Sequence, residues 1–256
     1  MRKSFMLMRR TVMFNLFRRS GHANLEWVGV DIHSHLLPGI DDGAPNVSVS
    51  LLFLKKLLSL GLKEFILTPH IYDEVFPNTQ ETIDYAHNKL YTEMEEAGLG
   101  DVYTHSSAEY MLGEKFDLLL DRRHLRPFPT NHLLVEVPWL AEPIQLERTI
   151  ANIVERGYRP IIAHPERYNF YHSRLIMYHQ LKEMGCALQL NLLSPIGYYG
   201  QKAAEAAHYL IENSMYDFLG TDLHHDRQLH KILKYVKSGN AYKDLGRLRL
   251  RNHELL

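Results

Sequence analysis

The feature that most constrains the fold is a regular alternation of short apolar runs with segments of helical spacing. Apolar runs typical of buried strands occupy positions 27–32, 63–67, 102–108, 133–136, 160–163, 187–190 and 216–219. The intervening segments 47–60, 79–96, 114–121, 144–156, 175–184 and 201–213 have the spacing of amphipathic helices. Strands that alternate with helices indicate a parallel sheet, and about seven such units without a linker predict a single (β/α)7 barrel over residues 28–256.

The predicted helices have recognisable ends. We expect Asn46 to cap the first helix and Gly61 to end it. The run Asn78-x-x-Glu81 has the form of a capping box, so the second helix is expected to begin there and to end at Gly98. Barrels of this kind gather their functional side chains at the C-terminal ends of the strands. The residues that follow each apolar run are therefore the candidates for a site.

The first predicted strand runs into Asp31-Ile32-His33-Ser34-His35, and a loop with Asp41 and Asp42 follows. On an extended chain the side chains at positions 33 and 35 point to one face, so the two imidazoles converge. Converging imidazoles beside carboxylates are typical of a metal site with mixed nitrogen and oxygen ligands. Taken alone, a His-x-His pair is equally compatible with two ordinary polar residues at a strand end.

Five of the other predicted strands also end in histidine, aspartate or glutamate. These residues are His70, Glu109, Glu136, His164, and Asp222 with His224, whereas the sixth strand, 187–190, ends without one. Because the C-terminal ends of barrel strands meet at one face, we expect the set to lie together. So many donors exceed the needs of one ion, and carboxylates can bridge, so the sequence predicts two or three divalent metal ions. Glu136 is the member that fits a salt bridge or an orienting role equally well.

Charge, cysteine content and absent motifs exclude several classes of protein. A formal net charge of -1 gives no general attraction to nucleic acid. The one cysteine, Cys186, precludes an intramolecular disulfide and fits a reducing compartment, so we expect a cytoplasmic protein. Neither G-x-x-x-x-G-K-[ST] nor G-x-G-x-x-G occurs, which argues against nucleotide phosphate transfer and against a dinucleotide cofactor.

The order of the motifs D-I-H-S-H, G-I-D-D-G, T-P-H, A-E-Y, V-E-V, A-H-P-E-R-Y and T-D-L-H resembles that of the polymerase-and-histidinol-phosphatase (PHP) superfamily. Within it, H-L-L-P-G-I-D-D-G at 35–43, H-P-E-R-Y at 164–168 and D-L-H at 222–224 are most similar to bacterial metal-dependent protein-tyrosine phosphatases of capsule and exopolysaccharide loci. The resemblance covers residues 28 to about 227. It implies a distorted (β/α)7 barrel with a trinuclear metal site, often loaded with manganese, with iron or zinc as alternatives.

The same resemblance implies roles for individual residues. His33, His35, Glu109 and Asp222 would hold one ion, and Glu109 and His164, with Glu136, a second. His70, His224 and either Asp41 or Asp42 would hold the third, since the register of the loop does not distinguish the two aspartates. Asp31 is expected to orient a histidine ring.

Two arginines follow the metal-site motifs and match arginines of the family. Arg167 lies three residues beyond His164, and Arg227 three beyond His224, so both are expected to bind phosphate; a surface ion pair is the alternative for each. Aromatic residues near the ligands are expected to wall a slot for a phenyl ring, with ordinary loop packing as the alternative: Tyr72, Phe76, Tyr110, Trp139, Tyr168, Tyr198 and Tyr199.

The sequence therefore predicts a metal-dependent phosphomonoesterase that uses a metal-activated hydroxide. The resemblance implies that its substrate is the phosphotyrosine-containing tail of a membrane-associated bacterial tyrosine kinase. Two alternatives are a phosphatase of a small metabolite such as histidinol phosphate and a non-catalytic regulator that binds the kinase. A cysteine-dependent phosphatase is excluded, because such enzymes use a C-x5-R loop and the residue six positions after Cys186 is Leu192.

Residues 1–27 read as a basic N-terminal extension outside the barrel. The first 25 residues have no acidic residue and six basic ones, and the longest uncharged run, 11–17, is too short to span a bilayer. A start at Met13 would give Met-Phe-Asn-Leu-Phe-Arg-Arg, which is similar to the start of related phosphatases. We expect the arm to make peripheral contact with an anionic membrane; a disordered tail without a role is the alternative.

Overall fold

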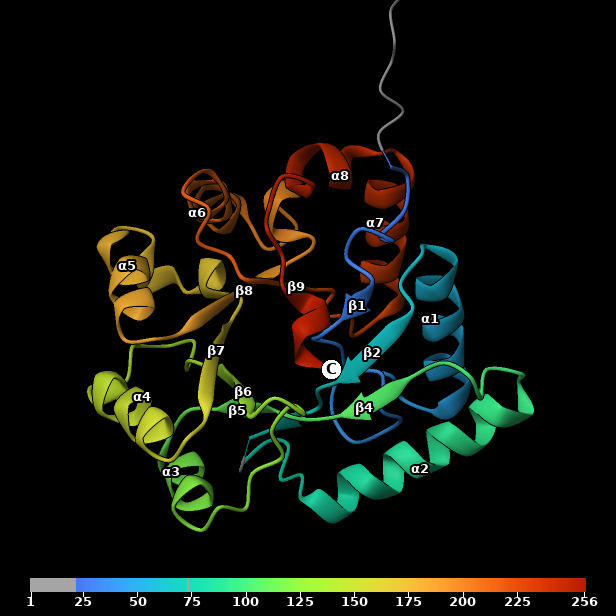
Figure 1. Ribbon diagram of the computed structural model, residues 1–256, viewed down its shortest axis with the longest axis horizontal. Helices are drawn as coiled ribbons and strands as arrows, with labels where there is room; N and C mark the ends of the chain where they lie inside the picture. Colours follow the sequence, from blue (N-terminus) through green and yellow to red (C-terminus); the bar gives the residue numbers. More distant parts are fainter. Residues whose placement is uncertain (1–21, 73) are drawn as a thin grey trace, which may run out of the picture.

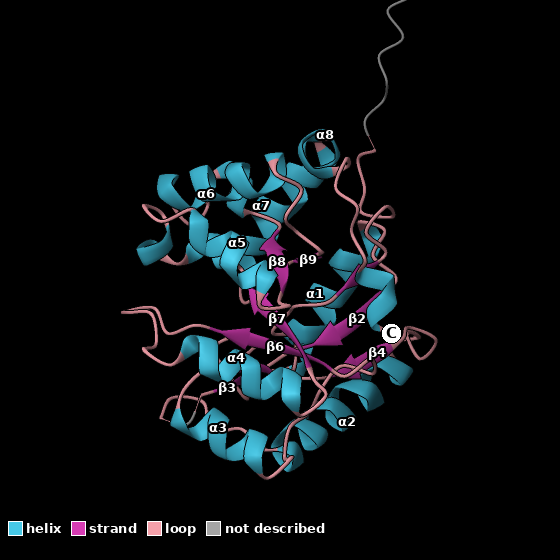
Figure 2. Cartoon of the chain, turned by 60° about the vertical axis from the view of Figure 1, so that its left-hand side comes forward, coloured by secondary structure: helices cyan, strands magenta, loops and turns pink. Residues whose placement is uncertain are grey.

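The computed structural model describes residues 22–72 and 74–256, and it confirms the predicted alternation of strands and helices. Helices surround the strands in Figure 1, and Figure 2 shows the same layering from the side. The helices are α1 (Val47–Ser59), α2 (Gln80–Glu96), α3 (Glu114–Asp121), α4 (Leu146–Glu155), α5 (Ile176–Glu183), α6 (Gln201–Glu212), α7 (Asp226–Lys237) and α8 (Asn240–Leu245). The strands are β1 (Val30–Asp31), β2 (Glu64–Leu67), β3 (His70–Ile71), β4 (Thr104–Ser106), β5 (Glu109–Met111), β6 (His132–Glu136), β7 (Arg159–Ala163), β8 (Ala187–Asn191) and β9 (Phe218–Gly220).

All strands pair in parallel, in the orders β1-β2-β4 and β3-β5-β6-β7-β8-β9. Two predicted strands are each broken into a pair, β2 with β3 and β4 with β5. Pro69 lies in the first break and has no N–H to donate to a ladder. Backbone bonds still cross the breaks, from Ser107 N to Leu67 O at 2.9 Å and from Glu109 N to Pro69 O at 3.0 Å. The sheet therefore curls into an open, distorted barrel instead of a regular one.

The first and last strands meet through a few specific contacts. Ser34 and Leu223 form an isolated parallel bridge beyond the ends of β1 and β9. Nearer the start of these strands, the buried amide of Asn252 donates to Val30 O at 2.8 Å and Leu219 O at 2.6 Å, and accepts from Leu219 N at 3.1 Å. The C-terminal segment thus pairs with both strand edges, which agrees with its position beside β1 in Figure 1.

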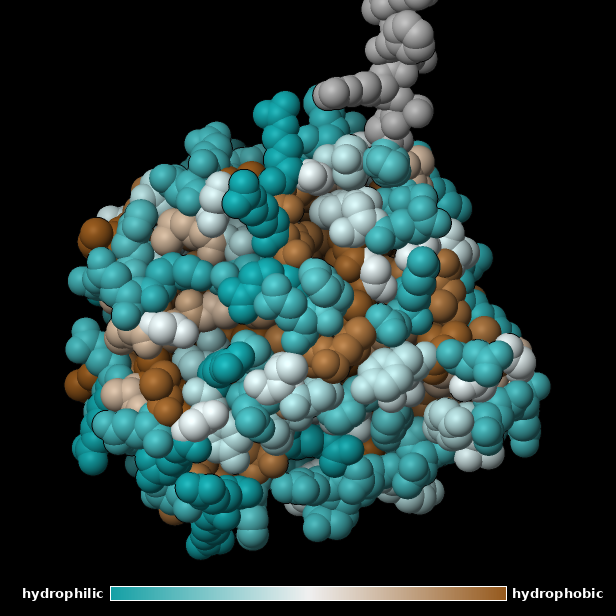
Figure 3. Space-filling model, viewed as in Figure 1, coloured by the Kyte–Doolittle hydropathy of each residue, from teal (hydrophilic) through white to brown (hydrophobic). Residues whose placement is uncertain are grey.

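The interior of the barrel and the layer beneath the helices form separate apolar clusters. Val30, Ile32, Ile66, Leu134 and Phe218 belong to the smaller, interior cluster. The larger cluster lies between strands and helices and continues into the N-terminal segment, where Leu25 is buried. No helix in the described part of the chain has the length and apolar character to span a bilayer. Figure 3 shows hydrophilic side chains over most of the visible face, with hydrophobic groups scattered between them.

Three local expectations need correction or lie beyond the described residues. The capping box of α2 uses Thr79 and Thr82, one residue later than predicted, because Asn78 is engaged elsewhere. The Asn78 amide donates to Ile40 O at 2.8 Å and His70 O at 2.9 Å, which ties two loops together. The helix expected from residue 144 begins at Leu146. Residues 1–21 of the basic arm lie outside the described part of the chain.

Candidate metal centre

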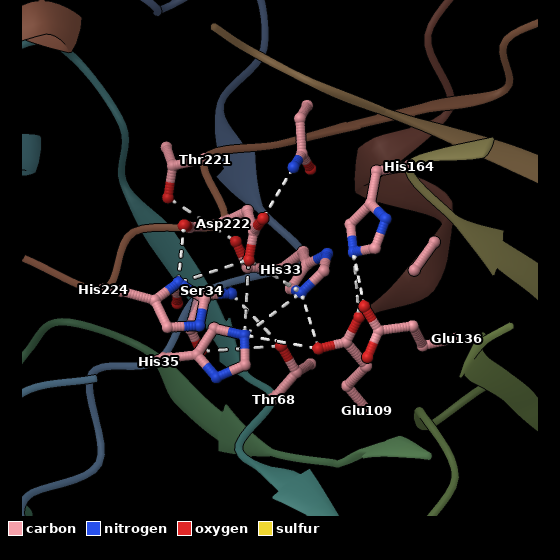
Figure 4. A network of polar contacts seen from close by, with 12 residues as sticks. His33, Ser34, His35, Thr68, Glu109, Glu136, His164, Thr221, Asp222 and His224 are labelled. Carbon is pink, nitrogen blue, oxygen red and sulfur yellow. Dashed lines mark hydrogen bonds and ion pairs between the residues drawn. The ribbon is translucent and has the colours of Figure 1, made fainter. Parts of the chain in front are cut away.

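Four buried side chains from three parts of the chain face one point. His33 Nε2 lies 3.3 Å from both Glu109 Oε2 and Asp222 Oδ1, and His35 Nε2 lies 3.4 Å from the same two oxygens. The two Nε2 atoms are 3.2 Å apart. Figure 4 shows these four residues directed at a common centre, as expected for an extended His-x-His segment whose two rings share a face.

Glu109 continues this group toward His164 and His70. Its Oε1 lies 3.1 Å from His164 Nε2, and its Oε2 lies 3.0 Å from His70 Nδ1. Glu136 Oε1 is 3.6 Å from the same His164 nitrogen. Glu109 Oε2 is fully buried, and none of the three ring nitrogens that surround it at 3.0 to 3.4 Å meets it with hydrogen-bond geometry. A buried carboxylate oxygen without a hydrogen-bond partner is costly unless a cation is bound beside it.

The two aspartates of the G-I-D-D-G loop have different surroundings. Asp42 Oδ1 lies 3.6 Å from His70 Nε2 and 3.4 Å from His224 Nε2, and its side chain is 58% exposed. Asp41 Oδ2 instead lies 2.8 Å from His35 Nδ1 and accepts from His70 N. Burial opposes ionisation of Asp41, but the His35 ring holds its pKa down at about 2. Asp41 therefore orients His35, whereas Asp42 faces His70 and His224.

Close backbone packing explains Gly43 of the G-I-D-D-G motif and Gly220, which precedes the T-D-L-H motif. A Cβ at Gly43 would lie 2.1 Å from His35 O, and a Cβ at Gly220 would lie 2.5 Å from His33 Cβ. Glycine thus allows the loop at Gly43 and the end of β9 at Gly220 to lie against the His-x-His segment. His164 and Asp222 themselves adopt positive φ angles of 32° and 49°. This conformation is unfavourable for non-glycine residues, and such strain is often found at functional sites.

The expected role of Asp31 is not the one observed. Its carboxylate accepts from Thr221 N at 2.9 Å and Thr221 Oγ1 at 2.6 Å, so it joins β1 to the end of β9 and contacts no histidine ring. Burial raises the pKa of Asp31 to about 6, against the lowering effect of these bonds. Gln189 Oε1 orients the His33 ring instead, at 2.8 Å from Nδ1.

Sequence reasoning missed Gln189 and Asn191, which lie on β8, the strand without a ligand. Gln189 Oε1 also accepts from His164 N at 3.2 Å, and Asn191 Nδ2 donates to Asp222 Oδ2 at 2.6 Å. Both amides are completely buried. A signal was present, because Ala-Leu-Gln-Leu-Asn places two polar residues at alternate positions of an otherwise apolar strand.

The electrostatics of the cluster suit divalent cations. Burial favours the neutral carboxyl, yet His33 with His70 holds the pKa of Glu109 well below its usual range, and His33 with His224 does so for Asp222. Burial and the charge of Glu109 raise the pKa of Glu136 well above its usual range. Burial lowers the pKa of His164 and His224 to about 4, which keeps both imidazoles neutral. Burial opposes protonation of His33 and His35, but Glu109 raises the pKa of His33 and Asp41 raises that of His35, so both rings must release a proton when a metal binds. Neutral imidazoles and carboxylates are the forms that bind metals.

Of the two predicted arginines, the structure brings only Arg167 into this cluster. Its Nη1 donates to Asp222 Oδ2 at 2.8 Å, and its guanidinium carbon lies 4.4 Å from the ring centre of Trp139 and 4.3 Å from that of Tyr199. The side chain is 21% exposed, so this ion pair is not a surface one. Arg227 is exposed on the first turn of α7 and does not line the cavity described next.

A cavity of about 250 Å³ opens over the cluster. Of the predicted aromatic wall, Tyr72, Phe76 and Trp139 line it. The Phe76 ring stacks on His70 at 5.4 Å between centroids, and Trp139 stacks on His164 at 5.6 Å. The remaining four are not in its lining: Tyr110, Tyr168, Tyr198 and Tyr199. The first two are buried in the core, and Tyr199 packs on Arg167. The floor of the cavity thus presents potential metal ligands, and its side presents one guanidinium and apolar ring faces.

The chain matches one family model and is similar to proteins named as tyrosine-protein phosphatases. The family model described as "Capsular polysaccharide synthesis, CpsB/CapC" matches residues 29–253. Tyrosine-protein phosphatase YwqE of Bacillus subtilis (strain 168) is 27% identical over 230 residues, which cover 89% of this chain and 91% of YwqE. Putative tyrosine-protein phosphatase CapC of Staphylococcus aureus is 24% identical over 237 residues, covering 88% and 92% of the two chains.

Two solved structures share the fold. A chain from the crystal structures of YwqE from Bacillus subtilis and CpsB from Streptococcus pneumoniae, described as unique metal-dependent tyrosine phosphatases, has a TM-score of 0.71 and 24% identity. The match covers 87% of this chain and 96% of that one. Histidinol phosphate phosphatase from Lactococcus lactis, solved with zinc, L-histidinol and phosphate, has a TM-score of 0.51 at 15% identity, covering 83% and 94%. These likenesses place the chain in a PHP-type fold.

Proposed function

Because the chain belongs to the CpsB/CapC family of capsular polysaccharide synthesis, we propose that it is a metal-dependent protein-tyrosine phosphatase. The observation that carries the proposal is the convergence of five histidines and four carboxylates beneath one cavity that also contains a guanidinium. The relatives named as tyrosine-protein phosphatases support the activity. Its substrate is the phosphotyrosine-containing tail of a membrane-associated bacterial tyrosine kinase of capsule or exopolysaccharide synthesis.

The donor groups divide naturally among three divalent ions. His33, His35, Glu109 and Asp222 would hold the first, in keeping with their distances of 3.2 to 3.4 Å. Glu109, His164 and Glu136 would hold the second. Asp42, His70 and His224 would hold the third, and Asp41 is left out of the ligand set because His35 engages it. Manganese is the expected metal, and iron and zinc accept the same mixture of ligands.

The chain's own residues provide binding and orientation. When bound, clustered divalent ions lower the pKa of a coordinated water and neutralise charge on phosphoryl oxygens. Arg167 presents its planar guanidinium to the cavity, where it can bind phosphate oxygens. Stacking between Trp139 and Tyr199 and the bond to Asp222 fix that plane before the substrate arrives. Trp139 and Phe76 offer ring faces against which a phenyl group can pack. Arg227 is exposed, so its proposed role is limited to phosphate or peptide groups outside the cavity.

A substrate comparison tests the proposal. With manganese present, turnover should be highest on a phosphotyrosine peptide and much lower on histidinol phosphate and on a phosphorylated DNA end. A chelator should abolish it, and added manganese should restore it. Thiol alkylation should have little effect, because Cys186 is buried and burial raises the pKa of its thiol to about 12. Preferred turnover of histidinol phosphate would instead assign a metabolite phosphatase, and no turnover with metals bound would assign a regulator.

The proposal extends to location. A cytoplasmic enzyme whose basic arm touches an anionic membrane would be concentrated near its membrane-bound substrate, each basic residue contributing about 1 kcal/mol near such a surface. Deleting residues 1–21 should leave turnover of a soluble peptide intact and weaken salt-sensitive binding to anionic vesicles. Loss of bound metal on deletion would show that the arm contributes to the barrel.

A further inference from the structure

Two loops that border the cavity expose apolar side chains. In the loop between β3 and α2, Tyr72 and Phe76 exchange backbone hydrogen bonds of 3.0 and 2.7 Å. Tyr72, Val75 and Phe76 all line the cavity, yet Tyr72 is 36% and Val75 53% exposed. The two bonds between Tyr72 and Phe76 therefore hold apolar side chains at the mouth of the site.

The second loop, residues 137–145 between β6 and α4, is fixed at several points. Val137 N donates to Tyr168 Oη at 2.9 Å, and the Glu142 carboxylate accepts from Tyr171 Oη and Arg174 Nη1, each at 2.9 Å. Trp139 lines the cavity, whereas the next residue, Leu140, is fully exposed at 100%. Because the loop is anchored on both sides of Leu140, the exposure of this side chain is part of the folded conformation.

We propose that these residues, Tyr72, Val75, Trp139 and Leu140, form an apolar rim that binds apolar side chains next to the phosphotyrosine of the substrate polypeptide. The inference rests on the proposed function. A phosphotyrosine side chain enters the cavity from a polypeptide that stays outside, so the flanking residues must cross the rim. Tyr72, Val75 and Trp139 line the cavity itself, and Leu140 follows Trp139 in the chain, so the rim adjoins the proposed phosphotyrosine pocket; this favours the substrate polypeptide over a second copy of the chain.

Charge on the rim argues against an anionic membrane as the occupant. Glu74 is exposed on the same loop as Val75 and is not one of the proposed metal ligands. Its carboxylate would be repelled by anionic lipid headgroups. A peptide tolerates such a neighbour, since its apolar side chains can contact the rim while its backbone stays in water. Removing one apolar contact of leucine size should weaken peptide binding by about tenfold.

The test compares three substrates in the full-length, manganese-loaded protein. One phosphotyrosine peptide has leucine on both sides of the phosphotyrosine, a second has serine there, and the third substrate is p-nitrophenyl phosphate. Leu140→Ser should raise KM about tenfold for the leucine peptide only, with kcat kept. Leu140→Met, which preserves an apolar side chain, should restore the wild-type KM. Leu52→Ser is the matched control, because Leu52 is 44% exposed on α1 and no residue of α1 lines the cavity.

Each result has one meaning. Equal KM changes for both peptides, or no change for either, would overturn the proposed role of the rim and leave the proposed phosphatase activity unaffected. Unchanged peptide kinetics with weaker binding to phosphatidylglycerol vesicles would assign Leu140 to a membrane, and a loss of self-association would assign it to a second copy. Absence of turnover on every phosphotyrosine substrate by the wild-type protein would remove the proposed function, and the inference with it.

Discussion

Replacing Gln189 by leucine tests whether an amide on β8 sets the geometry of the metal centre. Gln189 Oε1 lies 2.8 Å from His33 Nδ1 and accepts from His164 N at 3.2 Å. When Nδ1 carries the proton, Nε2 of His33 keeps its lone pair toward Glu109 and Asp222. Leucine has a similar size but accepts no hydrogen bond, so Gln189→Leu removes the orientation and keeps most of the volume.

The expected minimum magnitude follows from these two bonds, because Gln189→Leu also removes the bond from Nε2 to Asn191 Oδ1. Loss of a partner that orients a ligand lowers metal affinity by about 10- to 100-fold, or about 1.4 to 2.8 kcal/mol. The buried N–H of His164, left without an acceptor, should lower the free energy of unfolding by about 1 to 3 kcal/mol. Turnover at saturating manganese should recover most of its wild-type value, because the ligands themselves remain.

The assay is a manganese titration of chelator-treated protein, read by turnover of p-nitrophenyl phosphate, together with urea unfolding in the absence of metal. Gln180→Leu is the control, because Gln180 is exposed on α5. A Gln189→Leu protein with wild-type manganese affinity would refute the reasoning and show that the His33 ring is held by its own strand.

Three further outcomes are expected. Arg167→Lys keeps the charge and loses the planar fork, so turnover should fall about 10- to 1000-fold, or about 1.4 to 4 kcal/mol, at unchanged metal content; wild-type turnover would leave Arg167 with only its ion pair. Asp42→Asn should lower the number of metal ions bound per chain at saturating manganese, measured by mass spectrometry, whereas Asp41→Asn should keep that number and raise the manganese concentration needed to reach it, because it removes only a partner that orients His35; identical effects would contradict their different surroundings. Burial, with nearby arginines, lowers the pKa of His132 to about 4, so protonation of this ring opposes folding and the free energy of unfolding decreases as the pH falls from about 6.5 toward 4. His132→Gln should reduce that decrease in urea unfolding, and an unchanged dependence of stability on pH would contradict the reasoning.

The sequence was sufficient for the residues that follow strands. Parallel strands bring their C-terminal ends together whatever the loops do, so His33, His70, Glu109, His164 and Asp222 could be expected at one face. Their side chains do meet there. The prediction depended on residue type and strand order alone, and both are readable along the chain.

Features that depend on loop register could not be predicted from the sequence. Asp41 and Asp42 are adjacent and chemically identical, and their roles differ because the loop turns back at Gly43 onto His35. Asn252 belongs to a segment with no strong pattern, and its role arises from the edges of β1 and β9 that it happens to reach. The contacts of Asn252 join residues 33 and 222 positions apart, so local pattern carries no trace of them.

Strand β8 has no predicted metal ligand, but its two buried amides connect ligands from other strands by hydrogen bonds. His33 Nδ1 lies 2.8 Å from Gln189 Oε1, Gln189 Nε2 donates to Asn191 Oδ1 at 2.9 Å, and Asn191 Nδ2 donates to Asp222 Oδ2 at 2.6 Å. An amide can accept from one neighbour and donate to another, whereas a carboxylate at either position would add a buried negative charge beside Asp222. β8 therefore links a histidine that follows β1 to an aspartate that follows β9 by hydrogen bonds alone. A change in the orientation of His33 should therefore alter the orientation of Asp222 as well, although the two residues come from opposite ends of the chain.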